Sequence, residues 1–204
     1  KYMRQQRDGP FWDRASAKNK YDLIKIPGYH IGGWYDGYRN SLPRMIENVS
    51  APVKAMIGPW DHDFPHNAAL KPQVEWRHEA VRWFDQWLKQ VDTGILEEPK
   101  FAVYIRDYHE PDDSIEFIPG YWRWENEWPP ADLSKQTFYG HDNHYLSQEK
   151  SKFVEHKLKN KPSIGLEGGG PTMWWGSIPP DQKPMDKDSL FYDSDIFDES
   201  FEIL

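Results

Sequence analysis

Two polar residues with complementary chemistry each follow a short apolar run of the chain. Asp36 comes shortly after residues 29–31, and His62 comes shortly after residues 53–57. A carboxylate can hold an imidazole in one tautomer, and the imidazole can then take a proton from a nucleophile and return it to a leaving group. If both runs are strands of one parallel sheet, their carboxyl ends share an edge. We therefore expect the two side chains to lie within hydrogen-bond distance, roughly 2.6–3.2 Å.

The segments around these two residues predict alternating strands and helices. Residues 29–31 and 53–57 are short apolar runs that end at Gly, which is typical of buried strands. Residues 38–48 are compatible with a helix that has Pro43 in its first turn, and residues 74–91 have the apolar spacing of an amphipathic helix. The order of strand, helix, strand and helix predicts an α/β layered fold with a parallel sheet.

The character of the sequence changes near residue 97. The following half contains short aromatic or β-branched segments, separated by Pro, Gly, Asn and Asp, at residues 101–105, 121–124, 135–139 and 190–192. This pattern predicts antiparallel strands. Residues 1–97 are therefore expected to form the α/β part and residues 98–204 an all-β sandwich, with residues 147–187, which are polar and rich in Pro and Gly, as a long surface loop.

Composition excludes several classes of function. The formal net charge of −8 argues against a nucleic-acid partner, because a protein that binds the phosphate backbone needs a basic patch. The sequence has no Cys, which removes disulfides, thiolate metal sites and a Cys nucleophile. No apolar run approaches the length of a membrane span, so no membrane partner is expected. No motif indicates a cofactor, and the sequence does not indicate a cellular compartment.

Three other groups of residues could bind a ligand. One loop combines four residues of metal-binding type: Asp61, His62, Asp63 and His66. Their position beside a Gly-Pro-Trp segment makes a metal site the minority interpretation. Residues 141–144 are typical of a turn first and of a ligand cluster second. The pair Trp174 and Trp175 could stack on a sugar, although burial under the preceding Gly-rich loop is the expected role.

The segments that contain Asp36 and His62 also resemble those of a known family. The first reads Ile31-Gly32-Gly33-Trp34-Tyr35-Asp36-Gly37 and the second reads Ile57-Gly58-Pro59-Trp60-Asp61-His62. Together they are similar to the triad segments of the X-Pro dipeptidyl-peptidase, cocaine esterase and α-amino-acid ester hydrolase family of α/β-hydrolase serine hydrolases. Two further parts match in family order. Residues 82–89 resemble the last helix of the hydrolase domain, and residues 122–130 resemble the start of the C-terminal jelly-roll domain.

The resemblance implies that Asp36 is the triad acid and that His62 is the general base. It implies ester or peptide substrates, and a nucleophilic Ser in a Gly-x-Ser-x-Gly elbow before the acid. No Ser of this sequence has Gly at both of those flanking positions, so the nucleophile is expected upstream of the chain. Tyr38 and Arg39 occupy positions where the α-amino-acid ester hydrolases carry carboxylates, which argues against that specificity.

The sequence is thus interpreted as the C-terminal part of an α/β-hydrolase domain followed by part of a jelly-roll-type β-sandwich. Its expected partners are a small ester or peptide substrate and the missing N-terminal part of the hydrolase domain, or a second copy of the chain through self-association. The alternative is a non-catalytic binding protein that uses an aromatic-rich β-sandwich to hold carbohydrate or protein; 16% of the residues are aromatic.

Overall fold

A four-stranded sheet organises the chain. The computed structural model describes residues 2–112, 114–159, 161–162, 181 and 183–203. The strands lie side by side in chain order: β1 (Gly28–Gly33), β2 (Val53–Gly58), β3 (Phe101–Arg106) and β4 (Gly120–Glu125). β1, β2 and β3 are parallel, whereas β4 is antiparallel to β3. The predicted parallel pairing of the first two strands is confirmed, with Gly28 opposite Val53 and Gly33 opposite Gly58.

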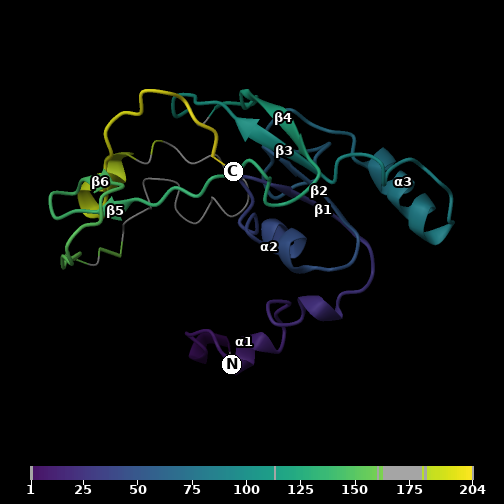
Figure 1. Cartoon of the computed structure of the whole chain (residues 1–204), viewed down its shortest axis with the longest axis horizontal. Helices are drawn as coiled ribbons and strands as arrows, with labels where there is room; N and C mark the ends of the chain where they lie inside the picture. Colours follow the sequence, from purple (N-terminus) through teal and green to yellow (C-terminus); the bar gives the residue numbers. More distant parts are fainter. Residues whose placement is uncertain (1, 113, 160, 163–180, 182, 204) are drawn as a thin grey trace.

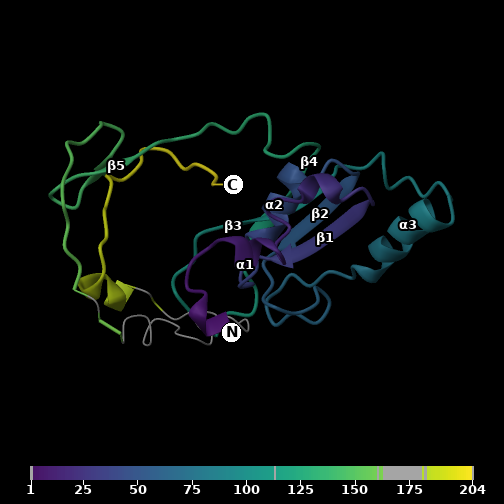
Figure 2. The same cartoon turned by 90° about the horizontal axis from the view of Figure 1, so that it is seen from below.

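The helix α2 (Ser41–Asn48) covers one face of this sheet, as Figures 1 and 2 show. Pro43 lies in its first turn, where a missing N–H costs no helical hydrogen bond. Leu42 and Ile46 are one helical turn apart, and both are buried. They pack against side chains that alternate along the strands: Ala55 and Ile57 of β2 with Phe101 and Val103 of β3. This cluster is the largest of the three buried clusters among the described residues.

The second helix of the α/β part, α3 (Arg77–Leu88), is attached to the opposite face by few contacts. Its buried side chain is Trp83, whose ring centroid lies 5.7 Å from that of Tyr29 on β1. Val81, Phe84 and Leu88 are three and four residues apart, so they lie on one face of the helix, and all three are exposed. Figure 1 shows α3 set apart from the sheet, at the opposite end of the molecule from strands β5 and β6.

The strand β3 and its neighbour β4 correct the expected domain division. Residues 101–105 and 121–124 were expected to begin a separate antiparallel sandwich, but β3 pairs in parallel with β2, and β4 extends the same sheet. The expected boundary near residue 97 therefore falls within a sheet rather than between two domains. The reason is local to β3: Phe101 and Val103 are buried against α2, which makes β3 a core strand of the α/β layer.

The rest of the described chain contains little regular structure. Short elements are η1 (Tyr2–Arg4), α1 (Pro10–Asp13), η2 (Tyr21–Leu23), β5 (Tyr139–Gly140), β6 (Leu146–Ser147) and η4 (Lys183–Asp188). The strands expected at residues 135–139 and 190–192 are absent, apart from Tyr139 in β5. Near these segments, an isolated bridge joins Tyr145 to Asp193 in place of a longer strand pairing. Much of the loop expected at 147–187, including Trp174 and Trp175, lies outside the described residues.

Within the described ranges no helix is long and apolar enough to cross a membrane.

The glycines that end β1 and β2 allow a very close approach to Trp60. A Cβ atom on Gly33 would lie 2.1 Å from the carbonyl oxygen of Trp60, and a Cβ atom on Gly58 would lie 2.4 Å from the indole ring. Trp60 itself is almost completely buried. A larger residue at Gly33 would push apart the loops that follow the two strands, and a larger residue at Gly58 would displace the ring of Trp60.

We predict that Gly33→Ala destabilises the chain by about 3 kcal/mol or more, because its methyl group meets rigid backbone rather than a movable side chain. The matched control is Gly32→Ala on the same strand, where the new Cβ would lie 3.1 Å from the terminal Cδ1 of Leu42. That side chain can shift, so the control should cost about 1 kcal/mol or less. Urea unfolding of both variants measures the difference, and equal losses would contradict the steric argument.

Candidate functional site

Two backbone hydrogen bonds hold together the loops that follow β1 and β2. The N–H of Trp34 donates to the carbonyl of Gly58 over 3.0 Å, and the N–H of Tyr35 donates to the carbonyl of Trp60, also over 3.0 Å. These bonds continue the parallel ladder beyond the ends of the strands. Asp36 and His62 follow directly, so the pairing of the two backbones sets the distance between the two side chains.

Trp60 fixes the position of the second loop. Its indole Nε1 donates to the carbonyl of Pro72 over 2.8 Å, while its ring packs in the core on the sheet face opposite α2, with Met56 and Ala102. A buried indole with a satisfied N–H is held both by its packing and by a directional bond. The segment from Trp60 to His62 therefore starts from a rigid point.

The side chains of Asp36 and His62 meet at this edge of the sheet. The Oδ2 atom of Asp36 lies 3.0 Å from Nδ1 of His62, while its Oδ1 atom accepts the backbone N–H of Tyr38 over 2.7 Å. The aspartate side chain is 18% exposed and the histidine side chain 38% exposed. The expected hydrogen-bond distance between the two residues is thus observed. With Nδ1 facing the carboxylate, Nε2 is the ring nitrogen that can face a reacting group.

A cavity of about 430 Å³ lies beside the pair. It is lined by three carboxylates, one imidazole and several aromatic rings, among them Tyr29, Trp60, Phe64 and Trp76. Phe64 and Trp76 are stacked, with ring centroids 5.5 Å apart. This volume is within the usual range for sites that hold small organic molecules. The arrangement can offer a base, a carboxylate and flat apolar walls to one ligand.

Asp61 is the most buried carboxylate of this cavity. It is 9% exposed, and its Oδ1 atom has no hydrogen-bond partner among the described residues. Burial raises the pKa of this carboxyl above its ordinary value, and the negative charges of Asp63 and Asp36 add to the effect. The surroundings of Asp61 thus disfavour the charged form of this carboxyl.

The structure does not gather the other candidate groups into a ligand site. His66 accepts a hydrogen bond from Nε1 of Trp76 at its Nδ1 over 3.0 Å, and Asp63 accepts the N–H of Phe64 over 2.7 Å. Among the described residues, no three His, Asp or Glu side chains are grouped as metal ligands would be. His144 has a positive φ of 61° in the turn between β5 and β6, in keeping with the turn role expected for residues 141–144.

Sequence reasoning missed one side chain at this edge of the sheet. Arg106, at the end of β3, donates to the hydroxyl of Tyr35 over 2.7 Å, and its guanidinium lies 5.1 Å from the centre of that ring. Because Tyr35 precedes Asp36, Arg106 braces the loop that carries the acid. Its position after a third apolar run was the available signal, but that run was assigned to a different domain.

We predict that Asp61→Asn raises the free energy of unfolding at neutral pH. A carboxyl whose pKa is raised on folding binds its proton more tightly in the folded state. The free energy of unfolding therefore falls as the pH rises from 3.8, the ordinary pKa of Asp, through the higher pKa of the folded state. The amide removes that loss. Urea unfolding across the pH range should show the gain at neutral pH shrinking in acid. A gain that stays constant, or a loss at neutral pH, would contradict this account.

Three comparisons with known proteins agree on the kind of protein that this chain resembles. Residues 1–63 match the model of the family described as X-Pro dipeptidyl-peptidase (S15 family). The chain is 27% identical over 118 residues to a protein of Mycobacterium bovis named "Putative serine esterase Mb1866c", and equally so to its counterpart MT1883 of Mycobacterium tuberculosis. This alignment covers 54% of the chain but only 17% of each relative, so the chain spans about a sixth of their length.

Solved structures give the same result for the fold. Two structures of a CocE/NonD family hydrolase, SACOL2612 from Staphylococcus aureus, superimpose with TM-scores of 0.51 and 0.50 at 16% identity. They match 73% of this chain and about a quarter of the other chain. At this identity the likeness concerns the fold alone. Together the comparisons confirm the resemblance carried by the two loop motifs: this chain is similar to the serine hydrolases of the X-Pro dipeptidyl-peptidase and CocE/NonD group.

Proposed function

We propose that this chain supplies the acid and the general base of a serine hydrolase that cleaves ester or peptide bonds, X-Pro dipeptide bonds included. The observation that carries the proposal is the 3.0 Å contact between Asp36 and Nδ1 of His62 at the edge where β1 and β2 both end. The nucleophilic serine belongs to another part of the parent protein, since no Ser here lies in a Gly-x-Ser-x-Gly segment.

In this proposal His62 carries one proton in each half of the reaction. Its Nε2 takes the proton of the serine hydroxyl as the serine oxygen bonds to the substrate carbonyl carbon, and it gives that proton to the leaving alcohol or amine. A water then loses a proton to His62 and attacks the carbonyl carbon of the acyl-enzyme. As the bond to the serine oxygen breaks and the acid leaves, His62 returns the proton to that oxygen. Asp36 keeps the proton on Nδ1 and stabilises the imidazolium that forms in each half.

The partner in this proposal is the remainder of the hydrolase domain. Within the described residues, β1 pairs with β2 on one side and with no strand on the other. An unpaired strand edge is a surface onto which another strand can add. The exposed apolar face of α3, formed by Val81, Phe84 and Leu88, supports the same proposal, because an exposed apolar patch is often a contact surface. Self-association is the alternative way to cover these surfaces.

A C-terminal β-sandwich is also part of the proposal. Its support is the short antiparallel pair β5–β6 and the resemblance of residues 122–130 to the start of the family's jelly-roll domain. Since β3 and β4 extend the α/β sheet, the sandwich would begin after β4. No observation on the described residues favours the alternative of a non-catalytic binding protein.

We predict that Asp36→Asn and His62→Ala in the parent protein leave folding intact and slow hydrolysis by several orders of magnitude. In a chymotrypsin-type triad the change from acid to amide lowers kcat about 10⁴-fold, because the imidazole takes the wrong tautomer. Turnover of p-nitrophenyl esters and of X-Pro p-nitroanilides measures the effect and separates esterase from peptidase preference. The matched control is Asp63→Asn, which makes the same change beside His62 without touching Nδ1. Near-normal turnover in either triad variant would refute the assigned roles.

We also predict that the 204-residue chain alone does not react with a fluorophosphonate probe, because His62 has no elbow serine beside it to activate. The parent protein, labelled under the same conditions, is the positive control. Intact-mass spectrometry measures the adduct. Stoichiometric labelling of a serine within the chain would show that the nucleophile is present and would overturn this part of the proposal.

A further inference from the structure

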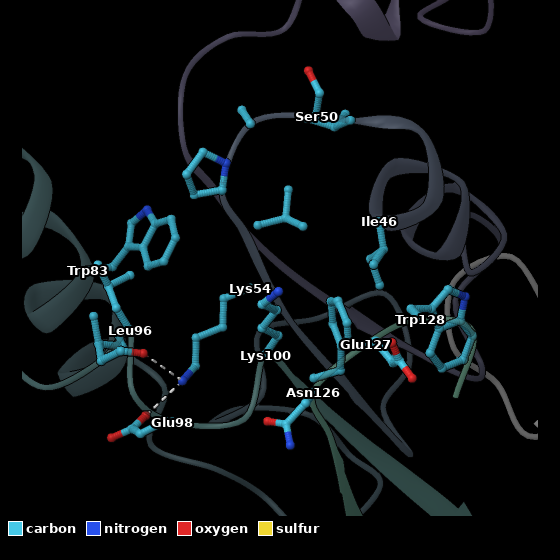
Figure 3. A pocket seen from close by; sticks show the side chains of 16 residues that line it. Ile46, Ser50, Lys54, Trp83, Leu96, Glu98, Lys100, Asn126, Glu127 and Trp128 are labelled. Atoms are coloured by element: carbon cyan, nitrogen blue, oxygen red, sulfur yellow. Dashed lines mark hydrogen bonds and ion pairs between the residues drawn. The ribbon is translucent and has the colours of Figure 1, made fainter. Parts of the chain in front are cut away.

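A second cavity, of about 510 Å³, lies at the opposite edge of the sheet from Asp36 and His62. It is formed where β2 and β3 begin and β4 ends, between the end of α2 and the loop that follows α3 (Figure 3). Since β2 has six residues, it separates the two edges by about 20 Å. A molecule in this cavity would therefore not touch the proposed catalytic pair.

The floor of the cavity holds a buried cation. The side chain of Lys54 is only 6% exposed, and its Nζ donates to Oε2 of Glu98 over 2.7 Å and lies 3.4 Å from the carbonyl of Ile95. Glu98 is held in turn by Arg82 of α3, which donates to Oε1 over 2.5 Å. Figure 3 shows the lysine reaching down from β2 to these two oxygens. The ammonium is thus fixed in place by a network that spans two elements.

The ammonium of Lys54 keeps one hydrogen bond that it can donate. An ammonium has three N–H groups, and two acceptors of Lys54 are identified among the described residues. Each oxygen of Glu98 already accepts one hydrogen bond, one from Lys54 and the other from Arg82. A ligand that brings an acceptor to the floor can use the remaining N–H of Lys54. An anionic oxygen is the best acceptor, because a charge-assisted hydrogen bond is about twice as strong as a neutral one.

The walls above this donor combine apolar rings with polar groups such as Ser50 and Asn126. Trp83 and Trp128 stand on opposite sides of the opening in Figure 3, and Ile46 of α2 lies on the side of Trp128. Val53 and Phe101 also line the cavity. Lys100 and Glu127 lie at the rim, and their charges cancel. One deep donor between two indole rings can hold a small molecule with a charged end and a flat apolar body.

We propose that this cavity binds a small monocarboxylate with an apolar or aromatic body. The carboxylate accepts from Nζ of Lys54, and the body lies between Trp83 and Trp128. The site is independent of the proposed hydrolase activity, since it shares no residue with the cavity beside His62.

The test uses the 204-residue chain and two probes of equal shape, phenylacetate and its neutral analogue phenylacetamide. Binding is followed by the indole N–H signals of ¹⁵N-labelled protein. Phenylacetate should shift the signals of Trp83 and Trp128 and leave that of Trp76, in the other cavity, in place. Phenylacetamide should bind about tenfold more weakly, which corresponds to the loss of one charge-assisted bond. Equal affinity for both probes would overturn the choice of a carboxylate.

Two variants locate the anchor. Lys54→Met removes the ammonium but keeps the length of the side chain, and it should abolish the response to phenylacetate. Lys100→Met is the matched control at the rim and should retain the response. If Lys54→Met does not fold, Trp128→Ala replaces it and should weaken binding at least about fivefold through loss of aromatic contact. The proposal is overturned by full binding in Lys54→Met or Trp128→Ala, by loss in Lys100→Met, or by no response of the unaltered chain up to about 10 mM.

Discussion

The candidate site depends on the contact between the backbone of Gly33 and the backbone of Trp60. A side chain on Gly33 would collide with the Trp60 carbonyl, so the absence of one lets the two loops approach until Tyr35 donates to that carbonyl. From that bond the chain needs only one further residue to reach Asp36 and two to reach His62. The 3.0 Å distance between the two side chains is then a result of backbone pairing rather than of side-chain attraction alone.

The two residues of the candidate site could be predicted from the sequence, whereas the pairing of strand β3 beside them could not. Asp36 and His62 could be predicted because each follows an apolar run in a parallel arrangement, and this arrangement brings strand ends to one edge. The course of β3 could not be predicted in the same way. Residues 101–105 have the aromatic and β-branched character of a strand in any sheet, and nothing in their pattern says that the partner is residues 55–57 in parallel. Pairing is decided by burial against α2, which a local pattern does not contain.

The charged residues show the same limit. Lys54 interrupts the apolar run of β2, and by composition it would be assigned to the surface. It is buried because Glu98, 44 residues later, is brought beside it and because Arg82 holds that carboxylate from the other side. Asp61 is the opposite case, since its Oδ1 lacks a partner within the described ranges. A buried charge can be recognised from sequence only when its partner is also known, and the partners here come from distant segments.

The hydrogen bond from the indole Nε1 of Trp34 to the carbonyl of Tyr104 joins residues that are 70 positions apart, over 2.8 Å. This bond connects the loop that carries Asp36 to strand β3, which the ribosome synthesises later. On a growing chain, β1 and β2 can pair early, but the neighbourhood of Asp36 gains this anchor only after Tyr104 has left the exit tunnel. Such long-range closure slows folding relative to local pairing. The geometry of the acid and the base is therefore completed only by a segment that is synthesised after both residues.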